Sequence, residues 1–119
     1  MEFRRGDVVL IAFPYIQDFS RSKTRPAVVI QNDVGNAFSD NLILASISSQ
    51  FPEQDFPVHY RIYAGSLIAK QAGLDVDCVV KAETIITIPK KQVIETLGHF
   101  SPEAMAEIDQ CLKVSLELE

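Results

Sequence analysis

The residues best suited to chemistry in this chain are one arginine and a group of serines. Arg25 is joined through Pro26 to an apolar run at residues 27–31, and a second apolar run at residues 42–48 leads into closely spaced serines. If both runs are neighbouring strands, a cation and hydroxyl groups meet at one end of a sheet. A guanidinium group is a rigid fork that fits phosphate oxygens, and a strand holds it more firmly than a loop does. The combination indicates a phosphate-bearing ligand, and specifically a nucleic acid.

Three serines near the end of the second run are candidates to face Arg25. Ser46 and Ser48 project to one side of a strand and Ser49 to the other, because side chains alternate along a strand. Spacing alone leaves both the Ser46/Ser48 side and Ser49 open as partners of Arg25. A structural salt bridge at the start of the strand is the alternative role for Arg25.

The charge of the chain excludes tight binding of nucleic acid by bulk electrostatics. The formal net charge is −5. Its distribution is uneven, because residues 1–31 carry five basic and three acidic side chains, +2 in all, whereas residues 101–119 carry one basic and five acidic side chains, −4 in all. A local basic site on an acidic body suits a selective enzyme better than a general RNA chaperone.

Length and composition favour a small globular protein with one core. The 119 residues are expected to form a single domain spanning residues 1–119, and a hydrophobic share of 47% is ordinary for a soluble protein. No apolar stretch is long enough to cross a membrane and the N-terminus does not resemble a secretory signal, so we expect a cytoplasmic protein. Cys78 and Cys111 have no metal-site spacing with His59 or His99 and are expected to be small buried hydrophobes. No metal or cofactor is expected.

The pattern along the chain predicts strands first and a helix last, which is an α+β domain. The expected strands are residues 8–13, buried on both faces, then 27–31, 42–48, 58–63, 78–80 and 84–88. Residues 15–24 are expected to form a loop, residues 32–36 a turn, and residues 81–83 a break between two strands. A short helix is expected to end near Gly73, and another over residues 90–97 to end at Gly98.

The last predicted helix has the clearest signals. Ser101 is a good N-cap, Pro102 suits the first helical position, and an acid lies in the first turn. An apolar face expected to pack on the core then follows at helical spacing: Met105, Ile108, Leu112 and Leu116.

Three stretches of the chain, taken in order and with their spacing, resemble the MazF/PemK (Kid-type) toxin endoribonucleases. These are Arg5-Gly6-Asp7-Val8-Val9, residues 25–33 beginning Arg25-Pro26-Ala27, and Ser48-Ser49-Gln50. The likeness runs from Arg4 to the C-terminus. It implies a small, strongly bent antiparallel SH3-like β-barrel with a C-terminal helix, usually a homodimer. It also implies the toxin of a type II toxin–antitoxin pair, an mRNA interferase that cleaves single-stranded RNA sequence-selectively and without metal.

The resemblance selects Arg25 and Ser48 as the catalytic residues. In the family the matching arginine and a threonine carry the reaction, and Ser48 stands at the threonine position, so the hydroxyl is kept but the methyl that restricts its rotamer is lost. Attack by the 2′-OH yields a 2′,3′-cyclic phosphate or 3′-phosphate and a 5′-OH. Since the pKa of arginine lies above about 12, we expect Arg25 to stabilise transition-state charge rather than to abstract a proton. His59 has a more suitable intrinsic pKa, but no sequence feature places it near Arg25.

Seven further residues are candidate RNA contacts, and most lie in the polar segment before Arg25. Single-stranded RNA binds to stacking rings and basic grooves, so Tyr15 and Phe19 are candidate stacking residues, with loop packing as the alternative. Gln50 contacts RNA or caps its strand. The full set is Tyr15, Gln17, Phe19, Arg21, Lys23, Ser49 and Gln50.

The resemblance also implies a partner. A cognate antitoxin is expected to cover the RNA groove, which lies across a dimer interface in the family, with an extended segment. Two other functions stay open: a CcdB-like toxin that binds DNA gyrase without cleaving RNA, and an inactive small-barrel interaction module. The family often has an amide and a base after the acid on the late strand, whereas this chain has Glu83-Thr84-Ile85-Ile86, which affects substrate choice more than cleavage.

Overall fold

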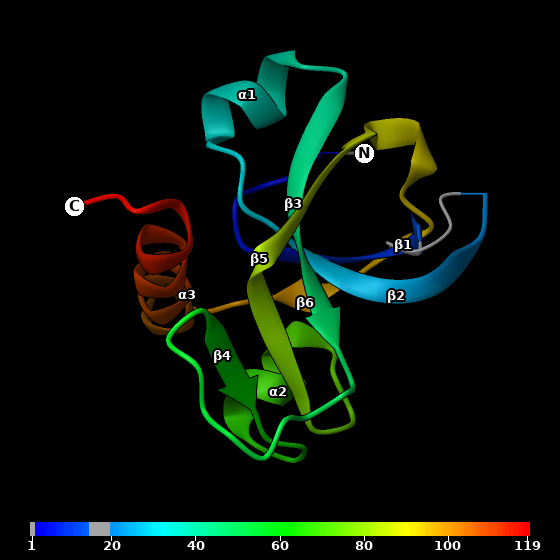
Figure 1. Ribbon diagram of the computed structural model, residues 1–119. Coiled ribbons are helices and arrows are strands. Elements are labelled where there is room, and N and C mark those ends of the chain that lie inside the picture. The colour runs from blue at the N-terminus through cyan, green and yellow to red at the C-terminus, as the bar shows by residue number, and fades with distance from the viewer. Residues whose placement is uncertain (1, 15–19) are drawn as a thin grey trace.

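The computed structural model describes residues 2–14 and 20–119, which form a curled antiparallel sheet with helices around it (Figure 1). The elements of this part of the chain are β1 (Asp7–Pro14), β2 (Ser22–Val29), α1 (Asp33–Phe38), β3 (Asn41–Ser48), β4 (His59–Ile62), α2 (Leu67–Ala72), β5 (Cys78–Pro89), the 3-10 helix η1 (Lys90–Gln92), β6 (Glu95–His99) and α3 (Pro102–Leu116). The expected α+β fold with a strongly bent sheet and a C-terminal helix is confirmed.

The six described strands lie in the order β4-β5-β3-β2-β1-β6, and every neighbouring pair is antiparallel. In Figure 1 the long strands β3 and β5 cross the centre of the molecule, while β1 and β2 curve away together toward one side. The helix α3 packs against β4 and β5, and α2 packs against β6. The sheet therefore curls into a half-barrel with helices at its edges.

Both faces of the curled sheet are buried, which explains the continuous apolar runs in the strands. One core joins Val8, Val28 and Ile47 to the inner sides of α2 and α3. The other lies inside the curl of β1, β2 and β3 and includes Val9 and Leu44. The prediction that residues 8–13 are buried on both faces is correct at Val8 and Val9 but wrong at Ala12, which is exposed.

The predicted pairing of the two apolar runs is confirmed, and it ends where the candidate site begins. Ala27 of β2 lies opposite Ser46 of β3, and Val29 lies opposite Leu44, but the described pairing goes no further toward Arg25. Pro26, which has no N–H to donate to a neighbouring strand, stands at this point. Beyond it β2 stays paired with β1 as far as Ser22. The strands β2 and β3 thus separate, leaving space between the residues that follow.

The expected bounds of β2 and of the preceding loop were wrong. The strand begins at Ser22, so residues 22–24 are not part of a loop, and it ends at Val29 rather than at Gln31. The physical reason is the pairing of Lys23 with Phe13 of β1, which makes a strand of a polar segment with little strand signal of its own.

The segment expected to be a turn, residues 32–36, instead begins the helix α1. The side chain of Asn32 accepts a hydrogen bond from the Gly35 N–H at 2.8 Å and caps the helix. Asn36 is buried, and its side-chain amide donates to the Gln31 carbonyl at 2.9 Å and to Asp33 at 3.1 Å. These side-chain contacts stabilise a helix whose composition is typical of a turn.

The predicted break at residues 81–83 is also wrong, because β5 is one continuous strand with a bulge. Ala45 of β3 lies opposite Ile85, whereas the next residue, Ser46, lies opposite Lys81. Residues 82–84 are therefore extra residues that have no partner on β3. A bulge bends a strand and redirects its side chains, so this one places Lys81 and Thr84 toward the gap between β2 and β3.

The helix expected over residues 90–97 is replaced by the short η1 and by β6. Gly98 lies within β6 and does not end a helix. An added Cβ at Gly98 would lie 2.3 Å from the Gln71 carbonyl oxygen and 2.5 Å from the carbonyl carbon of Ala72. The glycine permits the backbone of α2 to approach β6 closely, a requirement that local helical spacing does not reveal.

We expect the substitution Gly98→Ala to destabilise the fold strongly. The new methyl meets backbone atoms of α2 that have no side-chain freedom to move aside. Overpacking of this kind costs roughly 1–3 kcal/mol of unfolding free energy or more. Urea unfolding followed by circular dichroism measures the change. The matched control is Gly65→Ala, whose Cβ meets no atom within 4 Å, although its positive φ of 82° gives a smaller cost. Equal losses for the two variants would contradict the close approach.

The C-terminal helix α3 agrees with its sequence signals. Ser101 caps it by accepting from the Ala104 N–H at 3.2 Å, and Met105, Ile108 and Leu112 are buried. The predicted apolar face is wrong at Leu116, which is 53% exposed in the last turn. Among the described residues, no helix combines the length and apolar character needed to cross a membrane.

Candidate active site

A pocket of about 650 Å³ opens where β2 and β3 separate. Its lining comes from residues 23–26 at the start of β2, residues 46–50 at the end of β3, residues 73–76 after α2, and the side chains Leu10, Phe13, Cys78, Lys81, Thr84 and Leu97. Arg25 and Ser48 line the same pocket, as the strand pairing predicts. Ser46, Ser49 and Gln50 line it as well, together with Lys23.

Arg25 is half-buried in the wall of the pocket. Its guanidinium carbon lies 5.6 Å from the centre of the Phe13 ring, within the range of a cation–π contact. Phe13 is itself buried, as expected for a core residue. Among the described residues no carboxylate pairs with Arg25, so the salt-bridge role considered for it has no support there. The guanidinium therefore lies against an apolar ring in the pocket wall.

Ser48 is the last residue of β3 and is almost fully buried. Its Oγ accepts a hydrogen bond from the Gln50 N–H at 3.1 Å. Because a hydroxyl both accepts and donates, this contact orients the oxygen and leaves its hydrogen free to be donated into the pocket. Ser49, by contrast, is exposed.

Sequence reasoning missed Lys81 as a pocket residue. The β-ladders place Lys81 between Ser46 of β3 and His59 of β4, in one row across three strands. Lys81 is half-buried and is a third cation of the described lining, beside Arg25 and the exposed Lys23. The sequence signal for this role is a lysine within an otherwise apolar stretch, at a position where the pattern predicts a break between strands.

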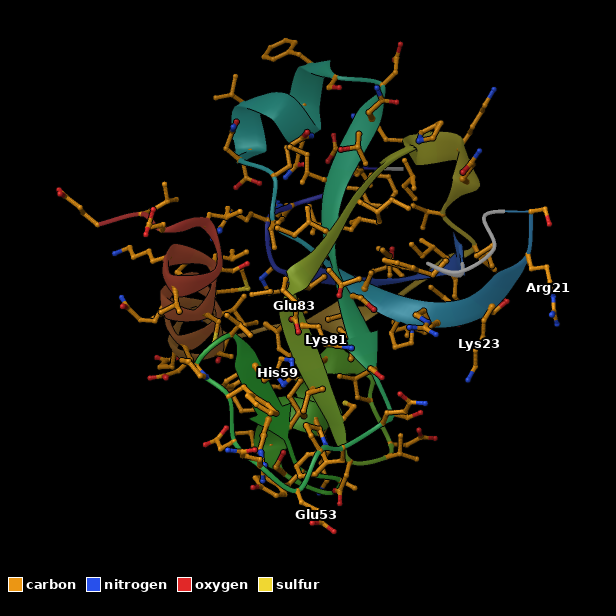
Figure 2. The ribbon with its side chains drawn as sticks, in the orientation of Figure 1. Arg21, Lys23, Glu53, His59, Lys81 and Glu83 are labelled. Carbon is orange, nitrogen blue, oxygen red and sulfur yellow. The ribbon has the colours of Figure 1, made fainter. Side chains whose placement is uncertain are left out.

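His59 lies close to the pocket wall without lining it. Its Nε2 is 2.7 Å from Oε2 of Glu83, the central residue of the β5 bulge. In Figure 2 Lys81, Glu83 and His59 gather near the centre of the molecule, whereas Arg21 and Lys23 project from its outer edge. His59 therefore has a carboxylate partner rather than a place beside Arg25.

Of the other candidate RNA contacts, two lie within the described residues and three lie outside them. Lys23 is exposed and lines the pocket, but Arg21, one residue before β2, does not belong to the described lining. Tyr15, Gln17 and Phe19 lie outside the described residues, so their positions are not tested.

The Arg5-Gly6-Asp7 stretch, part of the resemblance to the toxin family, has a structural role away from this pocket. Arg5 donates from Nε to the Ile30 carbonyl at 2.8 Å and from Nη2 to Asp109 of α3 at 2.7 Å. Asp7 accepts a contact from His99 at 2.7 Å. These contacts tie the N-terminal segment to the residue after β2, to the last residue of β6 and to the middle of α3.

The cysteines are buried, as predicted. Cys78 lines the pocket, but burial raises the pKa of its thiol to about 11, and the nearby carboxylates of Asp77 and Asp75 act in the same direction. The thiol is therefore protonated near neutral pH and is a poor nucleophile. Within the described ranges, no group of three or more His, Cys, Asp or Glu side chains is arranged to hold a metal ion.

Comparison with known proteins gives consistent matches over nearly the whole chain. Endoribonuclease EndoA of Bacillus subtilis (strain 168) is 35% identical over 118 residues, which cover 99% of this chain and 97% of the relative. Among solved structures, a mycobacterial endoribonuclease in complex with its cognate antitoxin matches with a TM-score of 0.76 and 19% identity, covering 98% of this chain and 97% of that one. MazF from Deinococcus radiodurans matches with a TM-score of 0.73 and 17% identity, covering 99% of each chain.

The family itself is shown by a match to its sequence model. Residues 4–116 match the model described as the PemK-like, MazF-like toxin of type II toxin–antitoxin systems. The matched span begins at Arg4, where the resemblance in the sequence begins, and includes every described residue of the pocket. The chain belongs to the family of PemK-like and MazF-like toxins of type II toxin–antitoxin systems.

Proposed function

We propose that this chain, acting as a single domain over residues 1–119, is an endoribonuclease that cleaves single-stranded RNA in the pocket between β2 and β3. The observation that carries the proposal is the meeting of Arg25, Ser48 and Lys81 in one pocket of a chain from this toxin family. The name of the Bacillus subtilis relative, an endoribonuclease, supports it. We propose further that the protein acts in the cytoplasm, where its RNA substrate is found.

The proposed reaction uses the 2′-OH of the RNA itself. The 2′-oxygen attacks the adjacent phosphorus as its proton leaves, the bond to the 5′-oxygen breaks, and that oxygen takes up a proton. The products are a 2′,3′-cyclic phosphate, or a 3′-phosphate after hydrolysis, and a 5′-OH. Negative charge grows on the phosphoryl oxygens in the transition state, and preorganised donors aimed at it accelerate such reactions.

Three side chains divide this task in the proposed mechanism. The Arg25 guanidinium is a bidentate partner for two phosphoryl oxygens, since it has no carboxylate partner among the described residues. The Ser48 hydroxyl donates one more hydrogen bond, while its oxygen is held by the Gln50 N–H. Lys81 supplies a second positive charge. Asp75 is the one carboxylate in the described lining, which supports a reaction without a bound metal ion.

The proposed RNA path extends from these groups along the pocket. Lys23, Ser49 and Gln50 line it, and we propose that they contact the strand on either side of the cleaved bond. We assign Tyr15, Gln17, Phe19 and Arg21 to the same path, because the segment that carries them leads into Lys23. Contacts of this kind would also select the RNA sequence.

Two protein partners belong to the proposal. We propose that a cognate antitoxin covers the pocket with an extended segment. The mycobacterial endoribonuclease that matches this fold is in complex with its own cognate antitoxin, which supports a partner of this kind. A second copy of the chain would form a homodimer. Val34 and Phe38 of α1 are 71% and 86% exposed, and a partner subunit would cover such apolar side chains.

The test is cleavage of a long, mixed-sequence, single-stranded RNA by the purified protein in EDTA, with mapping of the product ends. We expect discrete cuts that leave a 5′-OH and a cyclic or 3′-phosphate. Intact RNA across many sequences, with toxicity retained in cells, would instead support the CcdB-like function. Intact RNA without toxicity would support an inactive interaction module.

A further inference from the structure

A pair of aromatic rings begins at the residue after Gln50, which lines the pocket. Phe51 follows Gln50 in the chain, and its ring lies 5.4 Å from that of Tyr63, centre to centre, at a tilt of 58°. Tyr63 is 55% exposed, whereas Phe51 is half-buried. The pair therefore presents an open ring at the molecular surface, next to a residue of the pocket wall.

The pair is connected to the pocket from a second side as well. Ala64, the residue after Tyr63, donates its N–H to the Asp77 carboxylate at 2.8 Å. Asp77 follows Val76, which lines the pocket and is 52% exposed. The segment that carries Tyr63 is thus hydrogen-bonded to the segment before β5, and Phe51 follows the last residue of the lining at the end of β3.

The Phe51 ring, on which Tyr63 packs, is held in place before any ligand arrives. Nη2 of Arg61 donates to the Pro52 carbonyl at 2.8 Å and to the Glu53 carbonyl at 3.1 Å, which fixes the connection after β3 onto β4. The Arg61 guanidinium carbon also lies 4.9 Å from the centre of the Phe51 ring. A ring fixed in this way loses little conformational entropy when a ligand stacks on it.

The contacts of Arg61 also decide what kind of group fits here. Arg61 donates to two carbonyls from Nη2 and packs on the Phe51 ring with only 20% of its side chain exposed, so little of its charge faces the solvent. The surface offers an aromatic face rather than a free cation, which suits a nucleobase better than a phosphate. Stacking is also the interaction that an acidic protein needs, because a net charge of −5 supplies little affinity for RNA.

We propose that Phe51 and Tyr63 form a stacking subsite for a base of the RNA, next to the phosphate bound in the pocket by Arg25. The inference rests on the proposed function, because it needs single-stranded RNA in the pocket. It adds a contact on the β3–β4 side of the pocket. The Tyr63 ring is the exposed surface on which the base stacks, and Phe51 supports that ring from behind.

The test measures binding of a non-cleavable RNA to variants of Tyr63. The probe is a ten-nucleotide RNA that carries the mapped cleavage sequence, with a 2′-deoxy sugar at the cleaved bond and 2-aminopurine at each flanking position in turn. We expect Tyr63→Ala to raise the Kd by about 5- to 150-fold, the range for loss of one stacked base. We also expect it to abolish quenching of 2-aminopurine fluorescence at one position. Tyr63→Phe, which keeps the ring, is the matched control and should bind within about twofold of the unaltered chain.

The outcomes separate this inference from the proposed function. If the unaltered chain cleaves RNA and Tyr63→Ala has the same Kd and the same quenching, the stacking subsite is wrong and the function stands. If the unaltered chain cleaves no RNA, the proposed function fails and the subsite with it. If Tyr63→Ala binds RNA normally but no longer binds the cognate antitoxin, the surface belongs to that protein partner and the inference is overturned.

Discussion

Replacing Arg25 by alanine is expected to lower kcat for RNA cleavage by about 1,000-fold, the upper part of the range for removing one donor to a developing oxyanion. The physical reason is loss of the positive charge and of the planar fork that would bind two phosphoryl oxygens. Single-turnover cleavage of a short RNA carrying the mapped sequence measures this step apart from binding. Full activity in Arg25→Ala would show that the charge in the pocket comes from elsewhere, with Lys81 as the first candidate.

A second variant separates the shape of the Arg25 side chain from its charge. Arg25→Lys keeps the positive charge but offers a point charge in place of a fork, so we expect it to recover only about tenfold of the lost rate. In Arg25→Ala, loss of the contact with Phe13 costs about 0.5–1 kcal/mol of unfolding free energy, which is too little to unfold the protein. Circular dichroism and thermal unfolding check this. Arg4→Ala, an exposed arginine outside the pocket, is the control and should cleave at the unaltered rate.

The sequence was most informative where a local pattern and a long-range contact agree. The apolar runs of β1, β2 and β3 predicted strands, and their pairing placed Arg25 and Ser48 at one pocket because Pro26 stands where the pairing ends. The cap at Ser101 predicted the start of α3 in the same way. In each case the residues that form the element also carry the signal for it.

The predictions that were wrong concern segments whose structure is decided by a distant neighbour. Position 98 in β6 requires a glycine because the backbone of α2 leaves no room for a Cβ. No residue near it in the sequence indicates that close approach. The bulge at residues 82–84 shows only in the registers of β5 with β3, where Lys81 and Ile85 face consecutive residues. That same bulge orients Lys81, which is why this cation of the pocket was missed while Arg25 and Lys23 were found.

Removing the hydroxyl of Ser48 is expected to lower kcat by about 100-fold in Ser48→Ala, since one transition-state donor is lost. Ser48→Thr is expected to keep the full rate or to raise it up to about threefold, because a β-branched side chain restricts the rotamer of the hydroxyl. The same single-turnover assay measures both variants.

Ser46→Ala is the matched control, because the Ser46 Oγ lies on the same side of β3 but is buried and has no hydrogen-bond partner in the described structure. Its removal should leave the rate unchanged and cost no stability, since a buried hydroxyl without a partner is itself unfavourable. If Ser46→Ala loses as much activity as Ser48→Ala, the effect comes from a general disturbance of the β3 end, and the specific donor role of Ser48 is wrong.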